Sequence, residues 1–334
     1  MTSSADAPLL RVSGLRTTFP LQGGREAAAV DDVSFEIARG ETLGLVGESG
    51  SGKSVTALSI IRLVMPPGRI THGRIELEGR NLMDLGEEEM RQVRGRRIGF
   101  VFQEPMVALN PVYTIGFQIR ETLAVHNLAR GAAARKRTLE LLDAVRVPDP
   151  ARRAKEYPHQ LSGGLRQRAM IALALAADPA LVIADEPTTA LDVTVQAEVL
   201  DLLRDLRRTF GLSLLLITHD LGVVAEMADR VAVMYCGRIV EEAPVARLFS
   251  APAHPYTRGL LASIPGGQSG DRLAAIPGVV PALGQAGPGC AFAPRCGDRM
   301  KVCDTAPGLT TIGDGHTVRC FLHDLRSATP GVSS

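Results

Sequence analysis

The stretch Thr42-Leu43-Gly44-Leu45-Val46-Gly47-Glu48-Ser49-Gly50-Ser51-Gly52-Lys53-Ser54 decides the fold. Its apolar beginning predicts a buried strand, and the spacing of apolar residues from Val55 to Leu63 predicts a helix. The loop between them, Gly47 to Ser54, matches G-x-x-x-x-G-K-[ST]. Its glycines let backbone N–H groups cradle phosphate oxygens at a helix N-terminus, Lys53 adds positive charge, and the Ser54 hydroxyl can bind Mg²⁺. This motif predicts that a nucleoside triphosphate binds here.

Short apolar runs on both sides of this loop predict further strands of an α/β domain. They cover Arg74–Leu77, Ile98–Phe102, Leu181–Ala184, Leu214–Thr218 and Val231–Tyr235. Runs this short and this apolar are typical of strands buried on both faces of a mostly parallel sheet. Between Gly116 and Gln160 the pattern is helical, which predicts a helical insertion within the α/β domain.

Two adjacent carboxylates, Asp185 and Glu186, follow the predicted strand Leu181–Ala184. Open α/β sheets bind their ligands at the carboxyl ends of their strands. Asp185 can therefore serve Mg²⁺, directly or through water, and Glu186 can accept a proton from an attacking water molecule.

Length and composition narrow the classes of protein. The chain has 334 residues, 45% of them apolar, with 37 Lys+Arg against 36 Asp+Glu. This length indicates about two domains, and the composition excludes a disordered chain and a small disulfide scaffold. A net charge of +1 provides no basic surface for nucleic acid, so none is expected as a partner. No signal peptide and no apolar window long enough to span a bilayer is recognised, which predicts a soluble, cytoplasmic protein.

The cysteines are concentrated near the C-terminus. Cys290, Cys296, Cys303 and Cys320 fall within 31 residues, and the fifth cysteine, Cys236, stands alone. In a chain without an export signal, such clustering favours a metal site over disulfides. Pro and Gly make up 11 of the 25 residues from Pro265 to Gly289, which predicts an extended connector to a small tail.

A second glycine motif, Leu161-Ser162-Gly163-Gly164-Leu165-Arg166-Gln167, resembles the LSGGQ signature of ATP-binding cassette (ABC) ATPases. Serine and two glycines at a helix start form a second anion-binding nest, which needs an anion from elsewhere because the first loop already has its own. The resemblance implies a P-loop NTPase fold and a head-to-tail dimer, in which each signature covers the γ-phosphate held by the partner subunit. Leu165 departs from the glutamine usual at the fifth position, which puts a side-chain contact there in doubt but not the backbone nest.

Further motifs follow in the order that this family has. Gln103 resembles the Q-loop residue, Ala190-Leu191-Asp192 the D-loop, and His219 the switch histidine, while Phe19 matches the adenine platform although it could equally belong to the core. The resemblance implies Glu186, His219 and Gln103 as catalytic residues and Ser54, Gln103 and Asp185 as the residues around Mg²⁺. It implies ATP contacts by Phe19, Gly47, Ser49, Gly50, Ser51, Gly52, Lys53, Ser54, Gln103, Asp185, Ser162, Gly163, Gly164 and Asp192.

Three segments make the resemblance more specific. Phe102–Pro111, His254–Leu261 and the cysteine tail resemble the oligopeptide/dipeptide permease ATPase subunits, over about residues 9 to 325. The expected organisation is an ATPase domain over 9–260, with a helical subdomain at about 104–165, and a small irregular C-terminal domain over 261–325. The resemblance implies an ATPase that drives peptide import at the cytoplasmic face of the membrane. Its partners would be a second, homologous ATPase, two integral membrane subunits and an extracytoplasmic peptide-binding protein. A nickel or other small-solute importer and a non-transport ABC ATPase remain as alternatives.

The cysteine spacing, C-x5-C-x6-C-x16-C, lacks the paired C-x2-4-C knuckles usual in structural zinc sites. Four thiolates on irregular backbone suit a [4Fe–4S] cluster, and members of the family carry one in this tail. The interpretation is a cluster bound by Cys290, Cys296, Cys303 and Cys320, with Zn²⁺ as the alternative and free or oxidised thiols as a third possibility. Cys236 is expected to have no role.

Overall fold

The structure is a computed structural model that describes residues 7–189, 191–263 and 276–327. The chain divides into two compact units, and each is described here by itself. The first holds the described residues through Arg11, Glu36–Thr42 and Ile75–Ile217. The second holds Val12–Phe35, Leu43–Arg74 and the described residues from Thr218 onward.

A parallel sheet forms the centre of the first unit. Strand β7 (Leu181–Asp185) lies between β6 (Ile98–Val101) and β8 (Ser213–Thr218) and pairs in parallel with both. All five residues of β7 are buried, which confirms the expectation of strands covered on both faces. The strands fall within a residue or two of their predicted positions.

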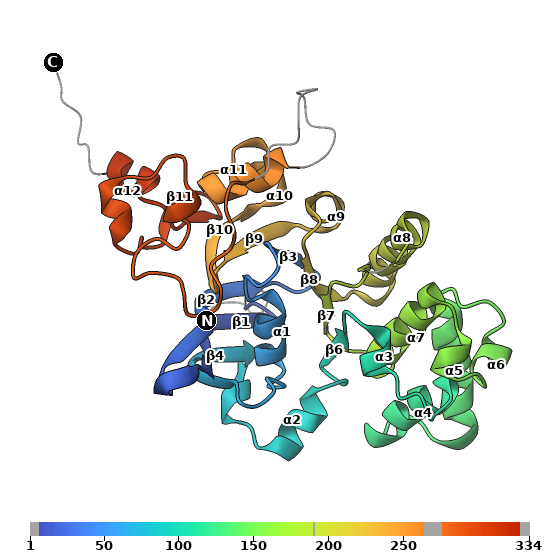
Figure 1. Ribbon diagram of the computed structural model, residues 1–334. Helices are drawn as coiled ribbons and strands as arrows, with labels where there is room; N and C mark the ends of the chain where they lie inside the picture. Colours follow the sequence, from blue (N-terminus) through green and yellow to red (C-terminus); the bar gives the residue numbers. More distant parts are fainter. Residues whose placement is uncertain (1–6, 190, 264–275, 328–334) are drawn as a thin grey trace. The chain divides into compact units, whose positions relative to one another are not determined.

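Helices make up the segment that the sequence predicted as an insertion. They are α3 (Pro105–Ala108), α4 (Ile115–Val125), α5 (Gly131–Ala144) and α6 (Pro150–Arg153), followed by α7 (Gly163–Leu175). Figure 1 shows α4, α5 and α7 packed against one another. Thr114 begins α4, because its hydroxyl accepts a hydrogen bond from the Phe117 amide. The buried Leu123 and Leu141 are among the apolar residues that hold the bundle together.

Further helices and one short strand belong to each unit separately. In the first unit, α2 (Glu87–Val93) follows β5 (Arg80–Asn81), and α8 (Val193–Phe210) packs on α7. Asp192 caps α8 by accepting from the Val195 amide at 3.0 Å, and Gly211 ends it in the left-handed conformation. In the second unit, α1 (Lys53–Ile60) follows the glycine loop, as predicted.

The second unit contains a mixed sheet. Strand β9 (Arg230–Tyr235) pairs in parallel with β3 (Thr42–Val46) and antiparallel with β10 (Arg238–Pro244). Two C-terminal strands, β12 (His316–Val318) and β11 (Thr310–Gly313), extend it antiparallel beyond β10. The sequence did not predict β10, β11 or β12. A separate sheet contains β2 (Glu26–Ile37), β1 (Leu10–Pro20) and β4 (Arg69–Leu77) in that order.

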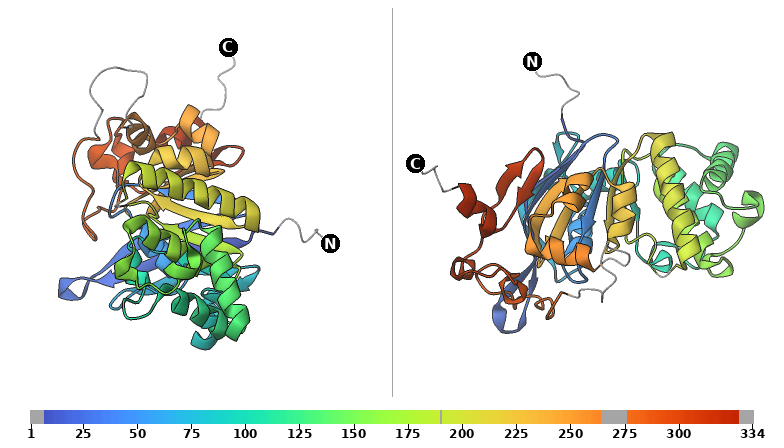
Figure 2. Two further views of the ribbon diagram at one scale, coloured as in Figure 1. Left: turned by 90° about the vertical axis from the view of Figure 1, so that its right-hand side faces the viewer. Right: turned by 90° about the horizontal axis from the view of Figure 1, so that it is seen from above.

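Helices cover the mixed sheet of this unit. Helix α10 (Val245–Ser250) packs on β9 and β10 and contacts α9 (Leu221–Met227) (Figure 1, Figure 2). Helices α11 (Pro255–Ala262) and α12 (Phe321–Ser327) follow, and α12 contacts β11. No helix in the described ranges is long and apolar enough to cross a membrane.

The cysteine tail shares a hydrophobic core with β3, β9 and α11 of the second unit. One cluster joins Val46, at the end of β3, to Tyr235, Tyr256 and Phe292, and Cys290 packs against it. Residues 276–289 form neither helix nor strand, as their Pro and Gly content predicted, while 264–275 lie outside the described residues. The domain limits at 260 and 325 stay predictions.

Candidate functional site

The glycine loop from Gly47 to Ser54 has a backbone that only glycine fits at two positions. Gly52, which precedes α1, has φ +106°, and a Cβ there would lie 2.3 Å from the Ala29 carbonyl oxygen. A Cβ on Gly47 would lie 2.2 Å from the Met234 carbonyl oxygen. The loop therefore runs tightly between β2 and β9, with its backbone rather than side chains available to a ligand.

Lys53 lies inside this loop. Its side chain is 5% exposed, and Nζ donates to the carbonyl oxygens of Gly47 at 2.8 Å and Glu48 at 3.1 Å. Ser51 is 1% exposed, and within the described residues its hydroxyl is buried without a hydrogen-bond partner. A buried cation and an unsatisfied hydroxyl in a glycine loop are the features expected of a phosphate-binding site.

Two more predicted residues lie in the second unit. Phe19 is a half-buried residue of β1, and its ring packs so closely on Gly68 that a Cβ there would be 2.5 Å away. His219 follows β8 directly and is exposed, and the next residue, Asp220, caps α9 by accepting from the Gly222 amide at 2.8 Å.

The acidic pair lies in the first unit, at the carboxyl end of β7. Asp185 is buried, and Glu186 has a left-handed backbone with φ +46°. Gln103 Nε2 donates to Glu186 Oε2 at 3.3 Å, and Thr189 Oγ1 donates to the same oxygen at 2.8 Å. Gln103 and Glu186, which the sequence predicted as catalytic residues, are 83 positions apart in the chain and are in contact in the structure. Thr189 also contacts Glu186, and the sequence did not predict this residue.

The signature segment begins helix α7, as predicted. Ser162 is the N-cap residue, and its hydroxyl accepts from the Leu165 amide at 3.4 Å. Ser162 and Gly163 are exposed, while a Cβ on Gly164 would come within 2.7 Å of Val195 Cγ1. The exposed N-terminus of a 13-residue helix presents free amide groups to an incoming anion. Asp192 is exposed at the start of α8, and Ala190 lies outside the described residues.

All four clustered cysteines line one small pocket in the second unit, and all are free thiols. The Cys303 sulfur accepts a hydrogen bond from the Met300 amide at 3.5 Å. Burial raises the pKa of the Cys290 and Cys296 thiols, and that of Cys320 to about 11. Within the described residues, no three His, Cys, Asp or Glu side chains are arranged to hold a single metal ion.

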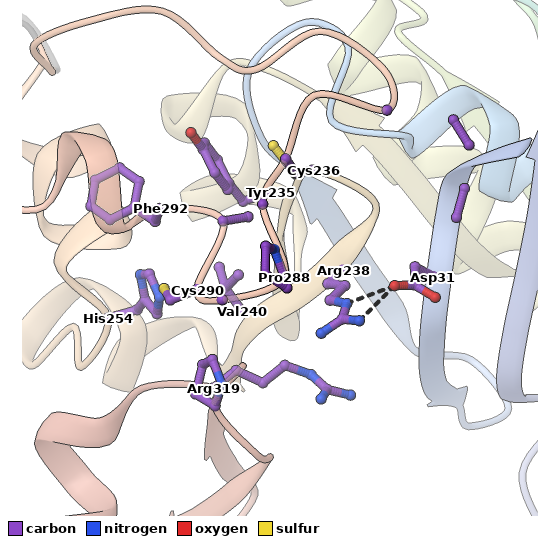
Figure 3. A pocket seen from close by; sticks show the side chains of 18 of the residues that line it. Asp31, Tyr235, Cys236, Arg238, Val240, His254, Pro288, Cys290, Phe292 and Arg319 are labelled. Atoms are coloured by element: carbon purple, nitrogen blue, oxygen red, sulfur yellow. Dashed lines mark hydrogen bonds and ion pairs between the residues drawn. The ribbon is translucent and has the colours of Figure 1, made fainter. Parts of the chain in front are cut away.

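A larger cavity of about 310 Å³ lies beside the tail, also within the second unit. Figure 3 shows Tyr235 and Cys236 on one side of it, with His254, Cys290 and Phe292 near one another. Arg238 donates twice to Asp31, at 2.6 and 2.9 Å, so both charges are satisfied. Residues Gly47–Ser54 are not part of its lining, so this cavity is separate from the phosphate loop.

Comparison with known proteins agrees with this geometry. Residues 30–189 match the ABC transporter family, and residues 240–303 match the oligopeptide/dipeptide transporter C-terminal region. A putative peptide import ATP-binding protein of Brucella abortus (strain 2308) is 52% identical over 94% of this chain and 95% of that protein. One of Brucella ovis is 52% identical over 94% of this chain and 97% of that protein.

Solved structures resemble the chain as well. A dimeric ATP-binding cassette in a post-hydrolysis state, bound to ADP and phosphate, is 31% identical with a TM-score of 0.63. The match covers 98% of that structure and 71% of this chain. A component of an ABC transporter complex from Clostridium perfringens is 26% identical, with a TM-score of 0.62 and coverage of 74% of this chain and 92% of that one. Glycine loop, acidic strand end, signature helix and C-terminal region together identify an ABC ATPase, and the chain belongs to the peptide import ATP-binding proteins of ABC transporters.

Proposed function

We propose that this chain hydrolyses ATP at the cytoplasmic face of the cell membrane to power the import of dipeptides and oligopeptides. The observation that carries the proposal is the presence, on one chain, of an ABC transporter family match over residues 30–189 and an oligopeptide/dipeptide transporter C-terminal region over residues 240–303. The relatives that are 52% identical are putative peptide import ATP-binding proteins, which supports the same substrate class.

The glycine loop binds the phosphates of ATP. Backbone amides from Gly47 to Ser54 surround the β- and γ-phosphate oxygens, and Lys53 supplies a charge that is already desolvated and held in place by two carbonyl oxygens. Ser49, Gly50, Ser51 and Gly52 complete the loop. Phe19 stacks on the adenine, an assignment that its half-buried position in β1 allows.

A magnesium ion fits the residue types available, because hydroxyl, amide and carboxylate oxygens suit this hard cation. Ser54, Gln103 and Asp185 would hold it, and it would neutralise charge on the phosphates. Ser54 is the second residue of α1, and the buried Asp185 ends β7, where open α/β sheets bind their ligands.

Glu186 acts as the general base. Its Oε2 oxygen is already fixed by Gln103 and Thr189, so the carboxylate is oriented before water arrives. It accepts the proton of the water that attacks the γ-phosphate. His219, exposed beside the N-terminus of α9, contacts the departing phosphate as the switch residue, and Gln103 relays the state of the site to the membrane subunits.

A head-to-tail dimer completes each ATP site. Ser162, Gly163 and Gly164 place an open helix N-terminus at the surface, and a γ-phosphate held by a second cassette supplies the anion that this nest needs. Asp192 lies beside this contact. The dimeric state of the similar ATP-binding cassette supports this arrangement.

Apolar side chains near Gln103 support docking to integral membrane subunits. Met106, Val107, Val112 and Tyr113 are all exposed on the segment that follows the Q-loop glutamine. An exposed apolar surface of this kind indicates a protein interface. The binding protein outside the membrane would act through those membrane subunits.

Co-purification tests this proposal. The full chain, tagged and expressed with the genes adjacent to its own, should be isolated in detergent with two polytopic membrane proteins and a second ATPase. Its ATP hydrolysis in that complex should rise when peptide-loaded binding protein is added. Activity that needs no membrane subunit and responds to DNA or ribosomes would instead indicate a non-transport ABC ATPase, and stimulation by nickel alone would indicate a metal importer.

We further propose that Cys290, Cys296, Cys303 and Cys320 hold a [4Fe–4S] cluster, with Zn²⁺ as the alternative. Four free thiols that line one pocket, with a backbone N–H donor on Cys303, support a set of metal-bound thiolates. When bound, the group would fix the tail; no step of ATP hydrolysis requires it.

Metal analysis of anaerobically purified protein tests this assignment. About four iron and four sulfide per chain are expected, in a brown protein, and Cys303→Ser should lose them. Cys236→Ser is the matched control and should keep them, because Cys236 lies outside the four-cysteine pocket. A colourless protein with one zinc per chain would contradict the cluster.

A further inference from the structure

The tail reaches the phosphate loop through one buried arginine. The Arg295 side chain is 4% exposed, Nη1 donates to Glu48 Oε2 at 2.7 Å, and Nη2 donates to Glu48 Oε1 at 3.0 Å. This is a bidentate guanidinium–carboxylate pair, the strongest geometry for such a contact. Glu48 is the second residue of the glycine loop, 247 positions earlier in the chain.

Other groups hold Arg295 in this position. Its Nε donates to the Pro277 carbonyl oxygen at 2.9 Å, and the guanidinium lies 5.9 Å from the Tyr235 ring centre and 6.0 Å from that of Phe292. Figure 3 shows these two rings lining the neighbouring cavity. A hydrogen bond and cation–π contacts therefore hold the guanidinium in place independently of its contact with Glu48.

A second tail-side residue holds the backbone of the loop. The Glu48 amide donates to the Tyr256 hydroxyl at 2.8 Å, and Tyr256 is a fully buried residue of α11. The Tyr256 ring packs on Tyr235 and Phe292, at centre-to-centre distances of 4.7 and 5.4 Å. Glu48 is thus held at two points, its carboxylate and its N–H, by residues that follow β10 in the chain.

We propose that Arg295 and Tyr256 are positioning residues for the phosphate loop, so that the C-terminal segment sets the affinity for ATP. The physical reason is electrostatic. Glu48 places a negative charge in a loop whose ligand is a polyanion, and this charge would repel the phosphates if it were unpaired. Arg295 neutralises the carboxylate and orients it toward the tail, while Tyr256 fixes the peptide that begins the loop.

This inference rests on the proposed function only in taking ATP as the ligand of the loop. A purely structural alternative exists, in which the same pair merely fastens the tail. The two differ in one respect: if the Glu48 charge is what harms ATP binding once Arg295 is gone, removing that charge restores binding even though the pair stays broken.

The experiment is a double-mutant cycle on the full-length chain, with the dissociation constant of a fluorescent ATP analogue as the readout. Arg295→Gln should weaken binding about tenfold, because the Glu48 carboxylate, left unpaired, repels the phosphate charges at short range. Adding Glu48→Gln should bring the constant back to within about threefold of the unmodified chain. Arg299→Gln is the matched control, since Arg299 forms an exposed ion pair with Asp304 in the same tail and should leave binding unchanged.

Two outcomes would overturn the inference. One is unchanged ATP binding by Arg295→Gln, and the other is a double variant that binds as weakly as Arg295→Gln alone, which indicates fastening of the tail only. If circular dichroism shows that Arg295→Gln does not fold, Tyr256→Phe decides, because it removes one oxygen and should weaken binding about threefold. Unchanged binding by Tyr256→Phe would then refute the inference. Failure of the unmodified chain to bind the analogue at all would refute the proposed function instead.

Discussion

Replacing Glu186 with glutamine should separate ATP hydrolysis from ATP binding. Gln103 and Thr189 both donate to one oxygen of Glu186, at 3.3 and 2.8 Å. A glutamine of the same shape can place its carbonyl oxygen at that position and keep both hydrogen bonds. It loses only the charge and the ability to accept a proton, so the fold and the nearby residues should be retained.

The size of the effect follows from these contacts. Two hydrogen bonds to a charged acceptor become two to a neutral one, which costs about 1–2 kcal/mol of stability at most. Loss of a general base lowers kcat by about 10²–10⁴-fold, equivalent to about 3–5 kcal/mol in the barrier. The KM for ATP should change by less than about threefold, because the phosphate loop is unchanged.

Phosphate release from the assembled transporter measures kcat and KM, and gel filtration with ATP measures dimerisation. Glu186→Gln should hydrolyse ATP at about 1% of the normal rate or less and should accumulate as a closed, ATP-bound dimer. Glu140→Gln makes the same chemical change on an exposed face of α5 and should be normal. Turnover above about a tenth of normal by Glu186→Gln would refute the assignment of the base.

The remaining predictions concern binding, assembly and pH. Lys53→Ala should weaken ATP binding about tenfold to a hundredfold by equilibrium titration, since a charge-assisted hydrogen bond contributes about 1.5–3 kcal/mol; unchanged affinity would contradict the role given to this side chain. Gly164→Val should lower ATPase activity of the assembled complex about tenfold or more while ATP binding persists, because its Cβ would lie 2.7 Å from Val195 Cγ1 and disturb the signature nest. Normal activity would show that this nest tolerates the shift. Burial, with a smaller effect of Arg96, lowers the pKa of His126 below 6.5. The unfolded chain therefore binds more protons than the native one below about pH 6.5, and native stability should fall as the pH drops through that region. Urea unfolding at several pH values should show a smaller loss of stability at low pH for His126→Gln than for the unmodified chain. The same pH dependence in both proteins would contradict the role of His126.

Local motifs explain why the centre of the fold was predictable. The loop from Gly47 to Ser54 joins a buried strand to a helix within 20 residues. The spacing of apolar residues and the glycines in this short stretch were therefore enough to predict the strand, the loop and the helix. The same holds for β7 with its two carboxylates and for the signature helix, whose N-cap serine is visible in the sequence. Each of these depends on contacts between near neighbours, which a pattern can report.

Long-range pairings explain what sequence patterns could not provide. Strand β12 has three residues and joins β10 through contacts about 75 positions away, such as Glu241 opposite Val318. The Arg295–Glu48 pair spans 247 positions, and no signal in the composition of the tail marks this arginine. Thr189 was also missed, since a threonine in a turn is ordinary until its hydroxyl is seen on Glu186.

ATP-driven peptide import is tested most directly by transport in vesicles. The chain, its partner ATPase and the two membrane subunits are reconstituted together, with ATP on the ATPase side and binding protein with labelled peptide on the other. Peptide should accumulate with ATP, and accumulation should stop with ADP or with Glu186→Gln. Peptide uptake that proceeds equally without ATP hydrolysis, or steady hydrolysis that moves no peptide, would contradict the proposed function.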